Sequence, residues 1–89
     1  YVFVLLYEGK GEKLTQMRHT LAKAKQQLAQ KAVFVECPAN SPEAEALQRK
    51  HELVGFRFPL LVPVSSTGVV THPFDYPPTV EQMRGAMLS

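Results

Sequence analysis

The chain has one cysteine, Cys37, which is the one side chain in the sequence with the character of a nucleophile. A single thiol cannot form an internal disulfide, so chemistry at Cys37 would need a partner's thiol or a modifying reagent. The competing interpretation is that Cys37 is a small buried hydrophobic residue. We assign no catalytic residue, and thiol-dependent redox chemistry at Cys37 stays open as an alternative.

A glycine- and lysine-rich segment offers a second candidate site, made of Gly9, Lys10, Gly11 and Lys13. If a helix begins there, its backbone amides attract anions, and the glycines let a ligand approach the backbone closely. The third glycine and the downstream acidic residue of a dinucleotide-binding motif are missing. The competing interpretation is an ordinary glycine-containing loop with solvated lysines.

The spacing of the histidines predicts no metal site. His19, His51 and His72 fall in two expected helices and one loop, and the sequence contains no His-x-x-x-His and no Cys-x-x-Cys. Clusters of ligands at such short spacings are what structural and catalytic zinc sites require. We therefore expect neither a bound metal nor a cofactor.

Positive charge is concentrated in the first third of the chain, although the net charge is only +2. Residues 8–31 contain six Lys or Arg and two Glu, a net charge of +4, whereas residues 36–52 carry −2. Such a basic stretch is usually a solvated helix face. A basic anion or nucleic-acid binder stays open as a second alternative, but the small net charge argues against nucleic acid.

Hydrophobic periodicity predicts seven elements along the chain. Between Leu14 and Leu28, apolar residues recur every three or four positions, which is one face of an α-helix. The unbroken apolar run over 1–7 is typical of a strand buried on both faces. The expected strands cover 1–7, 31–36, 58–64 and 69–71, and the expected helices cover 12–30, 42–53 and 80–89.

Capping residues mark the starts of two of these helices. Ser41 precedes Pro42, which suits the first position of a helix because proline needs no amide partner there. Thr79 is followed three positions later by Gln82, the spacing of a capping box. Both signals place helix starts independently of the hydrophobic pattern.

The order β-α-β-α-β-β-α predicts a single α/β domain over 1–89. The first two strands, joined by a helix, should be parallel with a right-handed crossover. Segments 58–64 and 69–71 should form an antiparallel hairpin through a glycine-containing turn. We therefore expect a four-stranded mixed sheet with helices on both faces. No apolar run approaches the roughly 18 residues of a membrane span.

This order of elements resembles the thioredoxin-like superfamily over nearly the whole chain. The most specific stretch is residues 54–70, VGFRFPLLVPVSSTGVV, in which a small turn, a proline, an apolar strand, a glycine turn and a further strand follow one another. The resemblance implies that Pro59 corresponds to the cis-proline of the family and Phe58 to the residue before it. It also implies that the backbone before this proline can pair with an extended peptide.

The chain departs from the family pattern at the redox motif. In redox members a Cys-x-x-Cys motif follows the first strand of this unit, but here that place is occupied by residues 8–14, EGKGEKL. Without a thiolate at the helix start, dithiol chemistry cannot be carried over. We therefore expect a non-redox binding or structural module that engages a protein or peptide. The expected site residues are Gly9, Lys10, Gly11, Lys13, Cys37, Phe58 and Pro59. The pattern does not determine compartment or oligomeric state.

Overall fold

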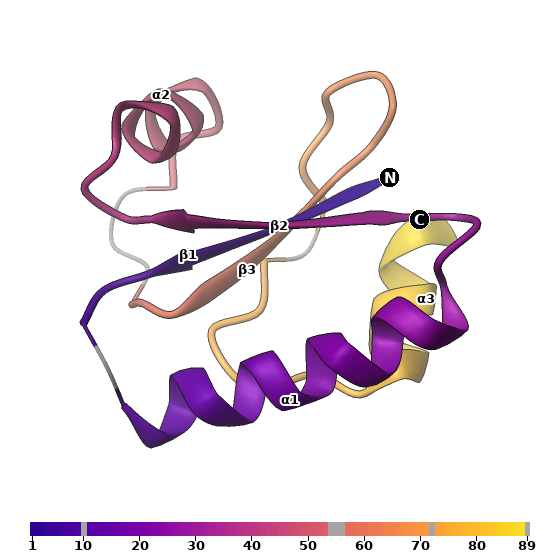
Figure 1. Ribbon diagram of the computed structural model, residues 1–89. Helices are drawn as coiled ribbons and strands as arrows, with labels where there is room; N and C mark the ends of the chain where they lie inside the picture. Colours follow the sequence, from indigo (N-terminus) through magenta and orange to yellow (C-terminus); the bar gives the residue numbers. More distant parts are fainter. Residues whose placement is uncertain (10, 54–56, 72, 89) are drawn as a thin grey trace.

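The computed structural model describes residues 1–9, 11–53, 57–71 and 73–88 of the chain. In these residues three strands form one mixed sheet, and three helices pack against it (Figure 1). The elements in chain order are β1 (Val2–Tyr7), α1 (Glu12–Gln27), β2 (Val33–Pro38), α2 (Pro42–Lys50), β3 (Leu60–Val64) and α3 (Val80–Leu88). Strand β1 lies in the centre, parallel to β2 and antiparallel to β3.

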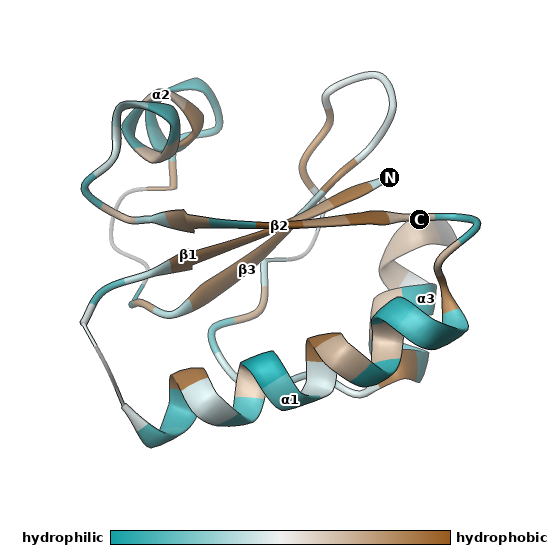
Figure 2. Cartoon of the chain, viewed as in Figure 1, coloured by the Kyte–Doolittle hydropathy of each residue, from teal (hydrophilic) through white to brown (hydrophobic). Residues whose placement is uncertain are grey.

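The helices cover both faces of the sheet, as expected. Helices α1 and α3 lie on one face and α2 lies on the other (Figure 1). Phe3 and Leu5 of β1 belong to the buried cluster that contains residues of α1 and α3. Leu6 belongs to a second buried cluster, which contains Ala44 of α2. Because both faces of β1 are covered, the strand is hydrophobic along its length (Figure 2).

The expectation of a four-stranded sheet is wrong, because segment 69–71 forms no strand beside β3. Val70 makes a single antiparallel bridge to Val64, and Phe74 makes another to Leu61. The two bridges are three residues apart along β3 (64 − 61) but four residues apart on the other segment (74 − 70). The register therefore changes between the bridges, and a regular ladder cannot form.

Pro63 gives the physical reason for this interruption. The carbonyl of Pro63 accepts a hydrogen bond from the amide of Thr71 at 3.3 Å, so the backbone of Pro63 faces the expected fourth strand. Proline has no N–H and supplies no donor at the point where the ladder would continue. The proline is visible in the sequence, but the side of β3 toward which its backbone points follows only from the pairing with β1.

Several element boundaries also differ from the prediction. Strand β2 continues through Pro38, so Cys37 lies within the strand and not after it. Strand β3 begins at Leu60, two residues after the expected start at 58. Helices α1 and α2 each end three residues before the expected ends at 30 and 53. Beyond α2, Glu52 has a φ of 53°, the left-handed conformation that commonly ends a helix.

Both predicted helix caps are confirmed. The Ser41 hydroxyl accepts a hydrogen bond from the Ala44 amide at 3.2 Å. The Thr79 hydroxyl accepts one from the Gln82 amide at 3.1 Å, and the Gln82 side-chain oxygen accepts one from the Thr79 amide at 2.8 Å. The capping box therefore satisfies two backbone donors at the start of α3.

Replacing Thr79 with alanine should lower the free energy of unfolding by about 1 kcal/mol, because a backbone amide loses its acceptor. Thr15→Ala is the matched control. The Thr15 hydroxyl donates only to the carbonyl of Gly11, which also accepts a bond from the Thr15 amide. Urea unfolding should show a change within about 0.5 kcal/mol for the control. Equal losses in both variants would mean that the capping box contributes nothing specific.

Candidate binding site at the carboxyl end of the sheet

One end of the sheet contains the carboxyl ends of β1 and β2 and the amino end of β3. In register, Leu6 of β1 lies between Cys37 of β2 and Leu60 of β3. The peptide bond that leads into β3, between Phe58 and Pro59, is cis. Pro59 is buried and Phe58 is half-buried. Phe58 and Cys37 pack against the same buried cluster.

A pocket of about 290 Å³ opens at this end of the sheet, and we call it the rim pocket. Its lining residues are Tyr7, Glu8, Gly9, Pro38 and Asn40. Gly9 has a φ of 60°, a conformation that favours glycine, and a Cβ added there would meet no atom within 4 Å. The Ala39 amide donates to the carbonyl of Tyr7 at 2.7 Å. This bond holds the loop after β2 against the end of β1, so the two walls of the rim pocket are fixed to each other.

Cys37 is half-buried and lies in the interior of β2. It packs against the cluster that contains Leu6, Ala44 and Leu60, on the face of the sheet that α2 covers. The thiol is therefore part of a strand packed beneath a helix. This environment differs from the start of a helix, where a backbone dipole stabilises a thiolate.

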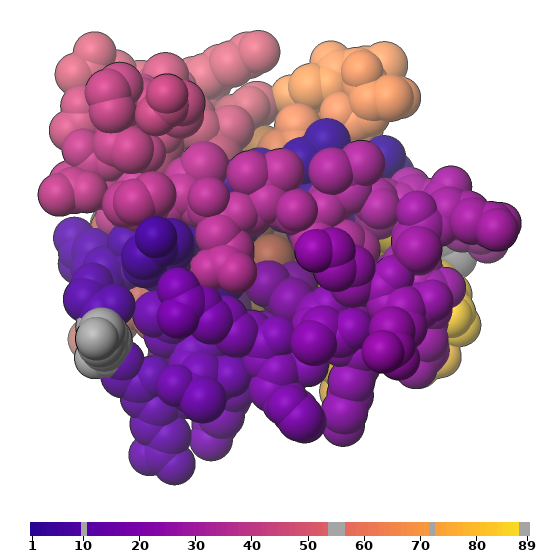
Figure 3. All heavy atoms as spheres, in the orientation of Figure 1, coloured from indigo at the N-terminus to yellow at the C-terminus, as the bar shows by residue number. Residues whose placement is uncertain are grey.

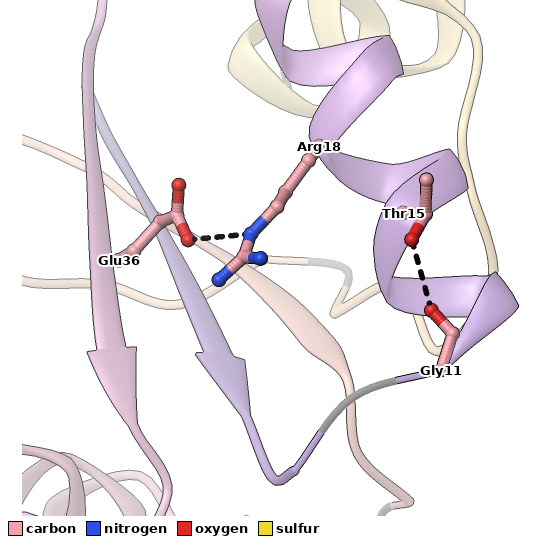
Figure 4. Close-up of polar contacts among 4 residues, drawn as sticks. All are labelled: Gly11, Thr15, Arg18 and Glu36. Atoms are coloured by element: carbon pink, nitrogen blue, oxygen red, sulfur yellow. Dashed lines mark hydrogen bonds and ion pairs between the residues drawn. The ribbon is translucent and has the colours of Figure 1, made fainter.

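The start of α1 lies on the other face of the sheet. Gly11 is the N-cap residue and provides no side-chain cap. Its carbonyl accepts hydrogen bonds from the amide and the hydroxyl of Thr15, each at 3.1 Å (Figure 4). Lys13 is exposed in the first turn. Cys37 packs on the α2 face, so the structure separates it from Gly11 and Lys13.

The expected site residues therefore fall into three groups and one remainder. Gly9 lines the rim pocket. Cys37 and Phe58 pack on the α2 side of the sheet, and Pro59 follows Phe58 through the cis bond. Gly11 and Lys13 lie at the start of α1. Lys10 lies outside the described residues.

The rim pocket also contains Tyr7, Pro38 and Asn40, which the sequence analysis did not single out, and Glu8, which begins the glycine- and lysine-rich segment. The residue types at Tyr7, Pro38 and Asn40 do not indicate a binding site in the sequence. These residues come together only through the register between β1 and β2.

Arg18 connects α1 to both parallel strands, and Figure 4 shows its contact with Glu36 of β2. Its Nε donates to Oε1 of Glu36 at 3.0 Å, and its guanidinium carbon lies 5.2 Å from the centre of the Tyr7 ring. The side chains of the ion pair are 47% and 46% exposed. Water screens such a pair, so we expect it to contribute no more than about 1 kcal/mol to stability. The pair holds the Arg18 guanidinium between Glu36 of β2 and the Tyr7 ring of β1.

Among the described residues, no group of three or more His, Cys, Asp or Glu side chains is placed to hold a metal ion. His19 lies on α1 and His51 caps the end of α2, while His72 lies outside the described residues. None of the helices in the described part of the chain has the length and hydropathy that crossing a membrane requires.

The sheet topology and the placement of the helices define the class of fold. A central strand flanked by one parallel and one antiparallel neighbour, covered by α1 and α3 on one face and α2 on the other, is a thioredoxin-like α/β arrangement.

One similar structure is the germline-specific thioredoxin Deadhead from Drosophila melanogaster. It has a TM-score of 0.69 and 13% sequence identity, covering 94% of this chain and 74% of the other. A second is described as a malarial protein, with a TM-score of 0.70 and 10% identity, covering 96% of this chain and 90% of the other. No protein-family model matches the sequence, and no curated protein sequence does. The similarity therefore establishes the thioredoxin-like fold.

Proposed function

We propose that the chain is a non-redox thioredoxin-like domain that binds a protein or peptide at the rim pocket. The observation that carries this proposal is the separation of the pocket from the thiol. The rim pocket is lined by the last residues of β1 and β2, Tyr7 and Pro38, and by residues of the loops that follow them, and Cys37 is not among the lining residues. Cys37 instead packs against the cluster beneath α2. A ligand can thus occupy the pocket without contacting the sulfur.

The chemistry of the lining suits an extended peptide. Glu8 and Asn40 are exposed beside Gly9, so the pocket offers a carboxylate, an amide and an accessible stretch of backbone. Asn40 has both a donor and an acceptor, which matches a peptide backbone, and the Tyr7 ring adds apolar surface. Glu8 favours a ligand that carries a Lys or Arg. These groups provide recognition of a peptide backbone and of a basic side chain.

The sequence supports the absence of thiol exchange in a second way. Disulfide exchange through a dithiol needs two cysteines, and the chain contains one. The segment that opens α1 contains glycine, lysine and glutamate in the place of the redox motif. Cys37 acting alone is the competing proposal, and its prediction is that any function of the domain disappears in Cys37→Ala.

A peptide-display selection with this chain tests the proposal. Peptides selected from a random library should bind the wild-type chain and lose at least about tenfold in affinity for Asn40→Trp, because the indole fills the rim pocket. Lys23→Trp places the same side chain on the exposed surface of α1 and is the matched control. Binding to the control and to Cys37→Ala should stay within about threefold of wild type.

Two results would contradict the proposal. If the selected peptides bind Asn40→Trp as tightly as wild type, the rim pocket is not the binding site. If Cys37→Ala abolishes binding while the variant stays folded, the thiol is required and the competing proposal is favoured. Circular dichroism and urea unfolding of each variant establish that the comparison is between folded proteins.

A further inference from the structure

Strand β2 forms one edge of the sheet, and no other described strand pairs with its outer side. The Val33 amide donates to the carbonyl of Tyr1 at 2.9 Å, and the Ala39 amide donates to the carbonyl of Tyr7 at 2.7 Å. The odd-numbered residues of β2 therefore direct their backbone groups toward β1. In a strand the alternate residues point the other way, so the amide and carbonyl of Phe34 and of Glu36 face outward.

The outward edge ends at Pro38. Proline has no N–H, and the Pro38 carbonyl already accepts hydrogen bonds from the Ser41 amide at 3.0 Å and the Ser41 hydroxyl at 2.8 Å. The loop into α2 thus occupies the last position of the edge. What remains is a short ladder of two residues, Phe34 and Glu36, with two donors and two acceptors.

The side chains along this edge have opposite character on the two faces of the sheet. Phe34 stacks on Phe3, with ring centres 5.3 Å apart, and so points to the α1 face. Cys37 packs in the cluster on the α2 face, and alternation places Val33 and Val35 on that face as well. Val33 is 60% exposed and Val35 is 41% exposed. Exposed apolar side chains along an unpaired edge form a surface on which another strand can pair.

On the α1 face, the edge borders a groove of about 190 Å³ between α1 and β2. Arg18 and Lys25 of α1 line it together with Phe34 and Glu36 of β2. Arg18 is paired with Glu36, which leaves the charge of Lys25 as the net charge of these four residues. In the space-filling view, atoms of β2 are visible at the surface between those of α1 and α2 (Figure 3).

We infer that the outer edge of β2 binds an extended segment of a partner protein in which apolar and acidic residues alternate. The segment pairs with the backbone of Phe34 and Glu36. Its apolar side chains cover Val33 and Val35, and its acidic side chains face Lys25 and Arg18. This site lies along the outer side of β2, whereas the rim pocket lies at the carboxyl ends of β1 and β2, so the inference does not depend on the proposed function.

The charge of α1 favours such a partner over a second copy of the chain. Two β2 edges could pair antiparallel about a twofold axis perpendicular to the sheet, which puts both copies of α1 on the same side. Helix α1 carries Lys13, Arg18, Lys23 and Lys25 against Glu12, a net charge of 4 − 1 = +3. Two such helices side by side repel each other, whereas an acidic segment is attracted.

Titration of the isotope-labelled protein with a heptapeptide of alternating Val and Glu, blocked at both ends, tests the inference by NMR. The amide resonances of Phe34 and Glu36 should shift, and their exchange with solvent should slow by at least about tenfold at saturation. The matching Val and Lys heptapeptide should bind about tenfold more weakly, because its charge is reversed. The affinity for the Val and Glu heptapeptide should fall as salt is added.

Two variants identify the groups that bind. Glu36→Pro removes one outward donor and should abolish binding of the Val and Glu heptapeptide. Lys25→Glu leaves the strand unchanged and should reverse the preference between the two heptapeptides. Because it does not alter β2, this variant keeps the test valid if Glu36→Pro does not fold. Neither variant should weaken binding of peptides selected on the rim pocket by more than about threefold.

Three outcomes would overturn the inference. The first is that Phe34 and Glu36 amides do not respond to millimolar Val and Glu heptapeptide. The second is that both heptapeptides bind equally well to wild type and to Lys25→Glu. The third is that sedimentation equilibrium shows a dimer that Glu36→Pro dissociates, because a second copy then occupies the edge.

Discussion

Phe3→Ala should lower the free energy of unfolding by about 3–5 kcal/mol, the range for removing a fully buried aromatic side chain. Phe3 is 0% exposed and lies in the central strand. Its ring stacks on Phe34 of β2 at 5.3 Å and on Tyr1 at 6.5 Å between ring centres. The loss is large compared with the roughly 5–15 kcal/mol that stabilises a typical domain. Chemical denaturation monitored by circular dichroism measures it directly.

Val33→Ala provides the control for Phe3→Ala. Val33 lies on β2, but its side chain is 60% exposed, so its removal should change stability by no more than about 0.5 kcal/mol. If Phe3→Ala and Val33→Ala cost the same, Phe3 is not in the core, and the assignment of β1 as the central strand is wrong.

Leu6→Ala should cost about 2–5 kcal/mol and should also expose Cys37. Leu6 is 0% exposed and lies in register between Cys37 and Leu60. Removing its side chain leaves a cavity in the cluster against which the thiol packs. Alkylation of Cys37 under native conditions should therefore become faster through local opening.

Leu14→Ala is the matched control for this second effect. Leu14 is 3% exposed and belongs to the cluster on the opposite face of the sheet. Its loss should destabilise the protein by a similar amount without opening the cluster around Cys37. If both variants accelerate alkylation equally, Cys37 reacts only from the globally unfolded state, and its placement beneath α2 is not the reason for its protection.

Local sequence patterns predict most elements of this fold. The spacing between Leu14 and Leu28 identifies α1, and the residue pair Thr79 and Gln82 fixes the start of α3, because both depend on contacts between near neighbours in the chain. The apolar run at the start of the chain predicts a strand with two covered faces. The order of these elements resembles the thioredoxin-like superfamily, and the similar solved structures support that resemblance at the level of the fold.

The errors arise where pairing across the sheet decides the outcome. The fourth strand was expected from its valines, but Pro63 faces that segment and interrupts the ladder. The rim pocket depends on the alignment of Tyr7 with Pro38, and no local pattern specifies that alignment. The face of the sheet on which Cys37 lies was also not predictable, because it depends on the position of Cys37 within β2. The parallel pairing of the first two strands predicts that Cys37 lies at the same end of the sheet as the loop after β1. It does not predict that Cys37 and Lys13 lie on opposite faces of the sheet.

The central claim is that this thioredoxin-like domain binds partners but does not exchange thiols. The most direct measurement is the rate at which dithiothreitol reduces a model peptide disulfide in the presence of the protein. The account predicts the same rate with wild type, with Cys37→Ala and without protein. Catalytic turnover that is present in wild type and lost in Cys37→Ala would contradict it.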